Sequence, residues 1–165
     1  MRALTLTQPW AGLVAAGIKR VENRPRAMIK REDFGKPFAI HASREIDVDV
    51  YERIAELAPE LRQMTIDRSP KQEEPWYQLS RITSAVIAIA TVADAMYIGG
   101  CNDAAITRAC ERAGIPEQRR WTFGPTVYVL RDVCALATPV PCRGRQGFWT
   151  LADWEASLVE EQLGG

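Results

Sequence analysis

The most informative segment of the sequence reads GIKRVENR from Gly17 to Arg24, and it directly follows the stretch TLTQPWAGLVAA. Pro9 is well placed to open a helix, and Gly17 tolerates the left-handed backbone conformation that ends one. The pattern therefore predicts a helix from Pro9 to Ala16, with a short strand before it and another strand beginning inside the quoted segment. Lys19 is expected on the loop between the helix and that second strand, which is a common place for a functional residue.

Away from this segment, runs of β-branched residues and helical spacing of apolar residues predict the remaining elements. Strands are expected around residues 4–6, 21–24, 38–42, 84–95, 126–131 and 134–140, and helices at 48–62, 102–113 and 153–163. Residues 25–37, broken by two prolines and a glycine, predict a loop, and residues 65–80 a connecting excursion. Strands mixed with helices but without regular alternation predict an α+β fold with a closed or half-closed barrel.

Length and composition are typical of one compact domain. The chain has 165 residues, of which 47% are hydrophobic and 25% charged, so it can bury a core without covalent staples. The N-terminus lacks the pattern of a signal peptide, and no segment reaches the roughly 20 apolar residues needed to cross a bilayer, so we expect a cytoplasmic protein. Four cysteines without a close CxxC pair and a single histidine predict reduced, mostly buried thiols, with neither a metal nor a cofactor.

Charge is balanced over the whole chain but unevenly distributed along it. The 21 basic and 21 acidic residues argue against a protein that coats nucleic acid indiscriminately. Residues 1–44, however, carry nine Lys or Arg against three Asp or Glu, and residues 117–145 carry five against two. Folding could bring these two basic blocks together, although each block by itself is also typical of a solvated face.

The sequence resembles the ASCH domain, the homology domain of activating signal cointegrators. The resemblance lies in QPW at 8–10, in the pattern GxKxxExR at 17–24 and in FAIHAS at 38–43. Further on, FGP at 123–125 and PVPCRGRQGFWTL at 139–151 resemble the family's closing strand and basic glycine loop. Nearly the whole chain is bracketed, which leaves about 44–83 as an unmatched insertion. The resemblance implies one domain over 1–165 with an α+β fold, the PUA-like mixed β-barrel (pseudobarrel) with peripheral helices.

The resemblance also implies a function. ASCH domains are similar to PUA domains, whose barrels bind RNA, and the proposed ligand site of the family is a cleft lined by the GxKxxExR segment. Some small bacterial members are amidohydrolases that act on acetylated cytidine with a Lys and a Thr of this segment and a more distant Glu. Here the position that matches this Thr is Glu22. We therefore expect a module that binds RNA or a modified nucleotide. The alternative is a hydrolase or ribonuclease acting on a nucleoside or RNA, with Lys19 and Glu22 as its catalytic residues.

Three charged residues of this segment are the first candidates for a site. Lys19 can pair with a phosphate as a point charge or act as a base if burial lowers its pKa, but it can also be a solvated surface lysine. Glu22 and Arg24 lie two apart on a strand and so share a face. They can form an ion pair that braces the barrel mouth. In the other interpretation Arg24 binds a phosphate or base edge while Glu22 accepts from an exocyclic amine.

Four uncharged or weakly basic residues are further candidates for ligand binding. Trp10 can stack on a base or pack in the core, and Gln8 can bind a ligand or complete a turn. His41 is expected on a buried strand, where a core histidine is the favoured interpretation and an imidazole facing the site is the other. Ser43 lies two residues later and so on the same face.

Two arginines in the basic glycine loop complete the set of candidates. The glycines beside Arg143 and Arg145 would let a phosphate approach the backbone closely. Trp121, Trp149 and Trp154 are assigned to packing. A third interpretation of the chain is a protein-interaction domain that contacts a partner through residues 44–83.

Overall fold

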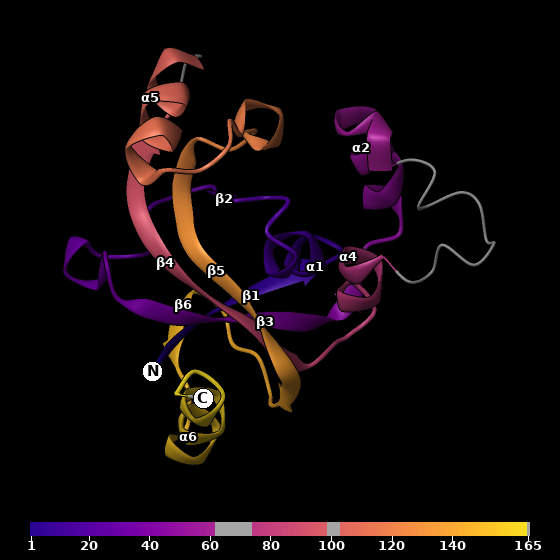
Figure 1. Ribbon diagram of the computed structural model, residues 1–165, viewed down its shortest axis with the longest axis vertical. Helices are drawn as coiled ribbons and strands as arrows, with labels where there is room; N and C mark the ends of the chain where they lie inside the picture. The colour runs from indigo at the N-terminus through magenta and orange to yellow at the C-terminus, as the bar shows by residue number, and fades with distance from the viewer. Residues whose placement is uncertain (62–73, 99–102, 165) are drawn as a thin grey trace.

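The computed structural model describes residues 1–61, 74–98 and 103–164 (Figure 1). Its strands are β1 (Arg2–Gln8), β2 (Val21–Arg24), β3 (Pro37–Ile46), β4 (Ala85–Tyr97), β5 (Thr126–Pro141) and β6 (Phe148–Thr150). Its α-helices are α1 (Trp10–Ala15), α2 (Asp49–Leu57), α4 (Pro75–Leu79), α5 (Asp103–Ala113) and α6 (Asp153–Glu161). Single 3₁₀ turns are η1 (Arg31–Asp33), η2 (Pro59–Leu61) and η4 (Arg119–Trp121).

The strands form one mixed sheet in the order β2-β5-β4-β3-β1-β6. Only β1 and β3 run parallel, and every other neighbouring pair is antiparallel. Although β2 is an edge strand and β1 is the fifth strand in the order, the Arg24 guanidinium of β2 donates to the Thr5 carbonyl of β1 at 2.9 Å. The sheet therefore curls, without closing, until a side chain of β2 reaches the backbone of β1, which agrees with the α+β pseudobarrel that the sequence predicts.

The expected strands are confirmed, with one correction. The two strands predicted at 126–131 and 134–140 are one continuous strand, β5, of 16 residues. Asp132 has a φ of 51°, and the pairing with β4 shifts by one residue at this point. This is a β-bulge, in which an extra residue bends the strand without ending it, and Asp tolerates the left-handed conformation better than most residues. The break that the sequence suggests is a bend.

Two helix predictions also need correction. The helix expected over 48–62 ends at Leu57, because Pro59 disfavours the helical conformation in the residue before it. The excursion expected over 65–80 includes a short helix, α4, which begins at Pro75. Residues 62–73 of the excursion and the expected cap at Asn102 lie outside the described residues.

Helices cover the sheet at several places and bury the core beneath them. Figure 1 shows α1 and α4 close together on one side, with α5 and α6 at opposite ends. Trp121 and Trp149 are buried as expected, but Trp154 is 58% exposed because the buried side of α6 carries Ala156 and Val159. Among the described cysteines Cys110 is buried, Cys142 half-buried and Cys134 exposed. The thiols are therefore less buried than the sequence predicts. None of the described helices is long and apolar enough to cross a membrane.

Candidate ligand cleft at the α1–β2 loop

The loop that carries Lys19 is held at both ends by backbone hydrogen bonds. Gly17 adopts a φ of 72° after α1, as predicted, and its amide donates to the Val14 carbonyl at 2.8 Å. The Lys19 amide donates to the Leu13 carbonyl at 3.1 Å. At the far end, the Arg20 amide donates to the side-chain oxygen of Gln118 at 2.6 Å. Both ends of the loop are therefore fixed, and the side chain of Lys19 is buried beside Glu22.

A cleft of about 230 Å³ opens where this loop and β2 face the end of β1. Residues of β1, α1, the loop, β2 and the turn before β5 line it. They are Thr5, Leu6, Thr7, Trp10, Lys19, Glu22, Asn23, Arg24 and Phe123. Four of the residues proposed from the sequence, Trp10, Lys19, Glu22 and Arg24, therefore line a single cleft.

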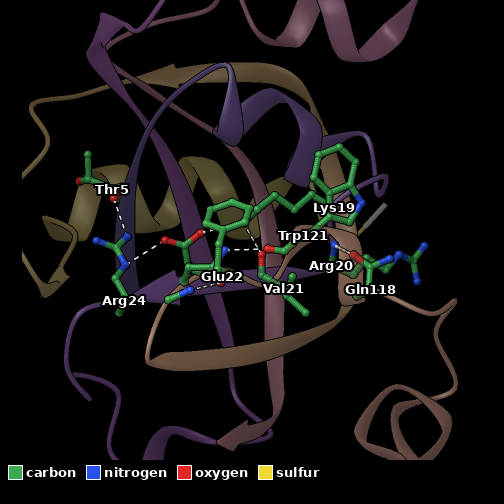
Figure 2. A network of polar contacts seen from close by, with 11 residues as sticks. Thr5, Lys19, Arg20, Val21, Glu22, Arg24, Gln118 and Trp121 are labelled. Atoms are coloured by element: carbon green, nitrogen blue, oxygen red, sulfur yellow. Dashed lines mark hydrogen bonds and ion pairs between the residues drawn. The ribbon is translucent and has the colours of Figure 1, made fainter. Parts of the chain in front are cut away.

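A network of buried charges forms one wall of the cleft (Figure 2). Glu22 pairs with Lys19 through one oxygen, at 3.2 Å from Nζ, and with Arg24 through the other, at 2.9 Å from Nε. Lys19 Nζ also donates to the Val21 carbonyl. Side-chain exposure is only 2% for Lys19 and 9% for Glu22, so both ions are largely removed from water. Two cations thus share one carboxylate.

Burial sets the protonation behaviour of Lys19. Loss of water lowers the pKa of this ammonium below its usual 10.5, and the Glu22 carboxylate opposes that effect. The solvated lysine considered from the sequence is therefore wrong, since only 1% of the residue is exposed. A buried, perturbed lysine beside a carboxylate in a cleft is the kind of group that is enriched at functional sites.

Aromatic rings form another part of the cleft wall. Trp10 lies 5.5 Å from Phe123 and 6.3 Å from Trp121 between ring centroids, and Lys19 Nζ lies 5.6 Å from the centroid of Trp10. Asn23 holds Phe123 in place, because its side-chain oxygen accepts from the Phe123 amide at 3.0 Å while its nitrogen donates to the Trp121 carbonyl. Trp10 is half-buried, so it both packs against the core and presents a face to the cleft.

Gln8 lies outside the cleft and has a structural role. Its side-chain nitrogen donates to the carbonyls of Leu79 and Ile82, at 2.8 and 2.6 Å, and its oxygen accepts from the Gly12 amide at 2.9 Å. Both of its N–H groups are therefore used, and the residue is fully buried. Gln8 joins β1 and α1 to the end of α4 and to the segment that follows it.

His41 and Ser43 on β3 also lie away from the cleft. The His41 ring is 1% exposed, contacts Trp149 edge-on and places Nε2 at 3.1 Å from the Cys142 carbonyl. Burial lowers its pKa, which favours the neutral imidazole. Ser43 donates to the Glu45 carbonyl at 3.0 Å. The favoured prediction of a histidine in the core agrees with this position, although no residue in the described ranges hydrogen-bonds its Nδ1.

The basic glycine loop stands beside the cleft without lining it. Arg143 and Arg145 are exposed, and the Arg145 guanidinium lies 5.9 Å from the ring of Trp149. Thr5 of the cleft donates to the Arg145 carbonyl at 3.0 Å. A side chain at Gly144 would place its Cβ 2.5 Å from His41 Cε1, so the space beside this glycine is filled by the imidazole.

Sequence reasoning missed several residues that line the cleft, chiefly Asn23 and Phe123. Both lie in stretches that carry the family resemblance, Asn23 within GxKxxExR and Phe123 in FGP. A signal was therefore present, but nothing in the sequence indicated that the two segments meet. Thr5, Leu6 and Thr7 join the cleft only because the sheet curls.

Comparisons with known proteins support the fold. No protein-family model and no curated protein matches this sequence. The structure is similar to the crystal structure of ASCH from Zymomonas mobilis, with a TM-score of 0.51 and 15% identity over 97% of this chain and 93% of that one. Two single-substitution variants of that protein give the same TM-score and identity, over 94% and 96% of their chains. The chain therefore has the ASCH-like fold.

Proposed function

We propose that this protein binds single-stranded RNA, or a modified nucleotide, by inserting one base into the cleft at the α1–β2 loop. The observation that carries the proposal is the pairing of an aromatic wall, Trp10 and Phe123, with two cations that share one carboxylate. Sequence-tolerant recognition of single strands combines these two features, stacking platforms and positive charge.

The charges of the cleft favour an anionic or electron-rich ligand. Lys19 and Arg24 together carry one positive charge more than Glu22 neutralises when all three are ionised. Arg24 is the most accessible of the three, with 19% of its side chain exposed, so it is the group best placed to contact a phosphate or base edge. Lys19 contributes its positive charge more than direct hydrogen bonds, because two of its three N–H donors already bond to Val21 and Glu22.

Titration of labelled single-stranded RNA at two salt concentrations tests this proposal. We expect modest affinity with a shallow dependence on salt, because only a few basic residues line the cleft. Lys19→Met, which keeps the volume of the side chain, should weaken binding. Glu22→Gln should leave affinity similar or improve it, since removing a carboxylate near an anionic ligand reduces repulsion. Absence of binding by the unmodified protein at low salt would contradict the proposal.

A second candidate function is hydrolysis of a nucleoside or of RNA. The specific observation in its favour is the lowered pKa of Lys19, because a lysine that loses its proton more easily can serve as a base or nucleophile. Glu22 would be its partner, at 3.2 Å from Nζ. We favour binding, since a carboxylate at position 22 is a poor replacement for the hydroxyl of the acetylcytidine hydrolases.

Turnover separates the two candidates. A hydrolase should convert acetylated cytidine or an RNA substrate, and both Lys19→Met and Glu22→Gln should abolish the reaction while substrate binding survives in Glu22→Gln. General acid–base assistance is commonly worth about 100- to 10,000-fold in rate, so the loss is easy to measure. Turnover by the unmodified protein that disappears in both variants would establish the enzyme and remove the pure binding function.

A further inference from the structure

A second and larger cavity lies beyond the end of β2. Its volume is about 480 Å³, and the β2–β3 connection faces the far ends of β4 and β5 across it. Figure 1 shows this connection reaching out beside β4. We call this cavity the groove; the residues that line it include Arg26, Ile29, Arg31, Asp94, Tyr97 and Tyr128.

Hydrogen bonds fix the wall of the groove that the β2–β3 connection forms. The Tyr128 hydroxyl accepts from the amides of Met28 and Ile29, at 2.7 and 3.0 Å. Beyond η1, the Gly35 amide donates to the Val92 carbonyl of β4 at 3.0 Å. The connection is therefore attached to the sheet at two points, and the groove between them is preformed.

The groove combines an apolar floor with unpaired positive charge at its rim. Ile29 and Tyr128 are buried in the floor, while Tyr97 is 77% exposed. Arg26 and Arg31 are exposed, and neither guanidinium forms a hydrogen bond or ion pair with any residue in the described ranges. The carboxylate of Asp94 also lines the groove, but Arg112 neutralises it in an ion pair. The open charges at the groove are thus two guanidiniums.

We infer that the groove binds a second nucleotide of the same single RNA strand, with its base on the apolar floor beside Tyr97 and its phosphate between Arg26 and Arg31. Guanidinium forks match phosphate oxygens, and an exposed aromatic ring offers a stacking face to any base. The groove also adjoins the cleft, because Arg24 lines the cleft while Pro25, the next residue, lines the groove. Thr126, which pairs with Arg24 across β2 and β5, lines the groove as well.

This inference rests on the proposed function, since it assigns the groove to the strand whose neighbouring base occupies the cleft. A protein partner would be the other class of occupant. Two unpaired arginines beside a preformed apolar floor favour the nucleotide, because that ligand brings an anion and an aromatic ring in one unit.

The test compares two double variants in binding an eight-nucleotide single-stranded RNA by fluorescence anisotropy. Arg26→Ala/Arg31→Ala removes the two groove charges. Arg44→Ala/Arg131→Ala is the matched control, because it removes the same net charge from exposed positions that line neither cavity. We expect the groove variant to bind about tenfold more weakly than the control, with a log–log salt slope smaller by roughly 0.7 for each phosphate that the variant no longer neutralises. Tyr97→Ala alone should weaken binding about fivefold or more.

Equal affinity and salt slope in the two double variants would overturn the inference, whatever else occupies the groove. Trp10→Ala in the cleft distinguishes failure of this inference from failure of the proposed function. Binding that depends on Trp10 but not on Arg26 and Arg31 would rule out the groove as a nucleotide site and support the cleft. Binding that depends on the two arginines but not on Trp10 supports the groove and removes the cleft. If neither the variants nor the unmodified protein binds the octamer, the result contradicts both the groove inference and the proposed function.

Discussion

The cleft and the groove hold their positive charges in opposite ways. In the cleft, Lys19 is buried and Arg24 mostly so, and both pair with Glu22. In the groove, Arg26 and Arg31 are exposed, and their guanidiniums have no partner in the described part of the chain. Burial makes the difference, because an ion removed from water needs a compensating charge while a solvated ion does not. The cleft is consequently part of the stable structure, whereas the groove charges are free for a ligand.

Removal of the shared carboxylate should have the largest effect. Glu22→Ala leaves Lys19 buried without its counter-ion, and breaking a buried ion pair in this way commonly costs about 3–5 kcal/mol of unfolding free energy. Urea denaturation of the unmodified protein and the variant measures it. Glu32→Ala is the control, because its pair with Lys30 is solvated, with 70% and 77% of the two side chains exposed. That pair should contribute less than about 1 kcal/mol. Similar losses of unfolding free energy in both variants would mean that the buried Glu22 network stabilises the protein no more than a solvated ion pair does.

Trp10 gives the next largest effect. Trp10→Ala should weaken RNA binding by about 5- to 150-fold, which corresponds to roughly 1–3 kcal/mol for one stacked base. Trp154→Ala is the matched control, since that indole is 58% exposed on α6 and lines neither cavity. Anisotropy titrations of both variants against the same oligonucleotide provide the measurement. If the two substitutions have the same effect, Trp10 does not stack on the bound base.

The burial of Lys19 should also make the stability of the protein depend on pH. The pKa of Lys19 lies below 10.5 in the native state, so as pH rises towards 10.5 the native protein releases this proton before the unfolded chain does. The unfolded state then binds more protons, and the free energy of unfolding should rise with pH by up to about 1.4 kcal/mol per pH unit in that window. Lys19→Met should lack this contribution, which appears as the difference between two series of urea titrations. A flat difference below pH 10.5 would contradict the lowered pKa.

The smallest effect is expected in the groove. Arg26→Ala/Arg31→Ala should change the free energy of unfolding by no more than about 0.5 kcal/mol, because both side chains are solvated and unpaired among the described residues. Thermal or urea unfolding checks this directly. A loss comparable to that of Glu22→Ala would show that the groove arginines support the fold and are not reserved for a ligand.

The same contrast explains how far the sequence could predict this molecule. Local signals were sufficient at the α1–β2 loop, where Gly17 ends a helix and Lys19, Glu22 and Arg24 follow within one short segment. The strands were predicted for a similar reason, since β-branched runs are local. The cleft charges were therefore found from the sequence, although their burial was not.

Contacts between distant segments could not be predicted in the same way. The groove exists because the Tyr128 hydroxyl holds the amides of Met28 and Ile29, about 100 positions earlier in the chain. Gly144 was interpreted as room for a phosphate, yet His41 fills that space from another strand. Gln8 is a ligand candidate in the sequence, yet its side chain donates to the carbonyls of Leu79, the last residue of α4, and of Ile82. Each of these contacts depends on which segments become neighbours in the fold. Local composition and residue spacing do not contain that information.

The position of a bound base tests most directly whether the cleft is the binding site. Single-stranded RNA carrying 4-thiouridine can be photocrosslinked to the unmodified protein, and mass spectrometry of the digested complex identifies the attached peptides. We expect crosslinks to the peptides that contain Trp10 or Phe123, the aromatic wall of the cleft. Crosslinks confined to peptides remote from the cleft, such as the one that contains the exposed Trp154 of α6, would contradict it.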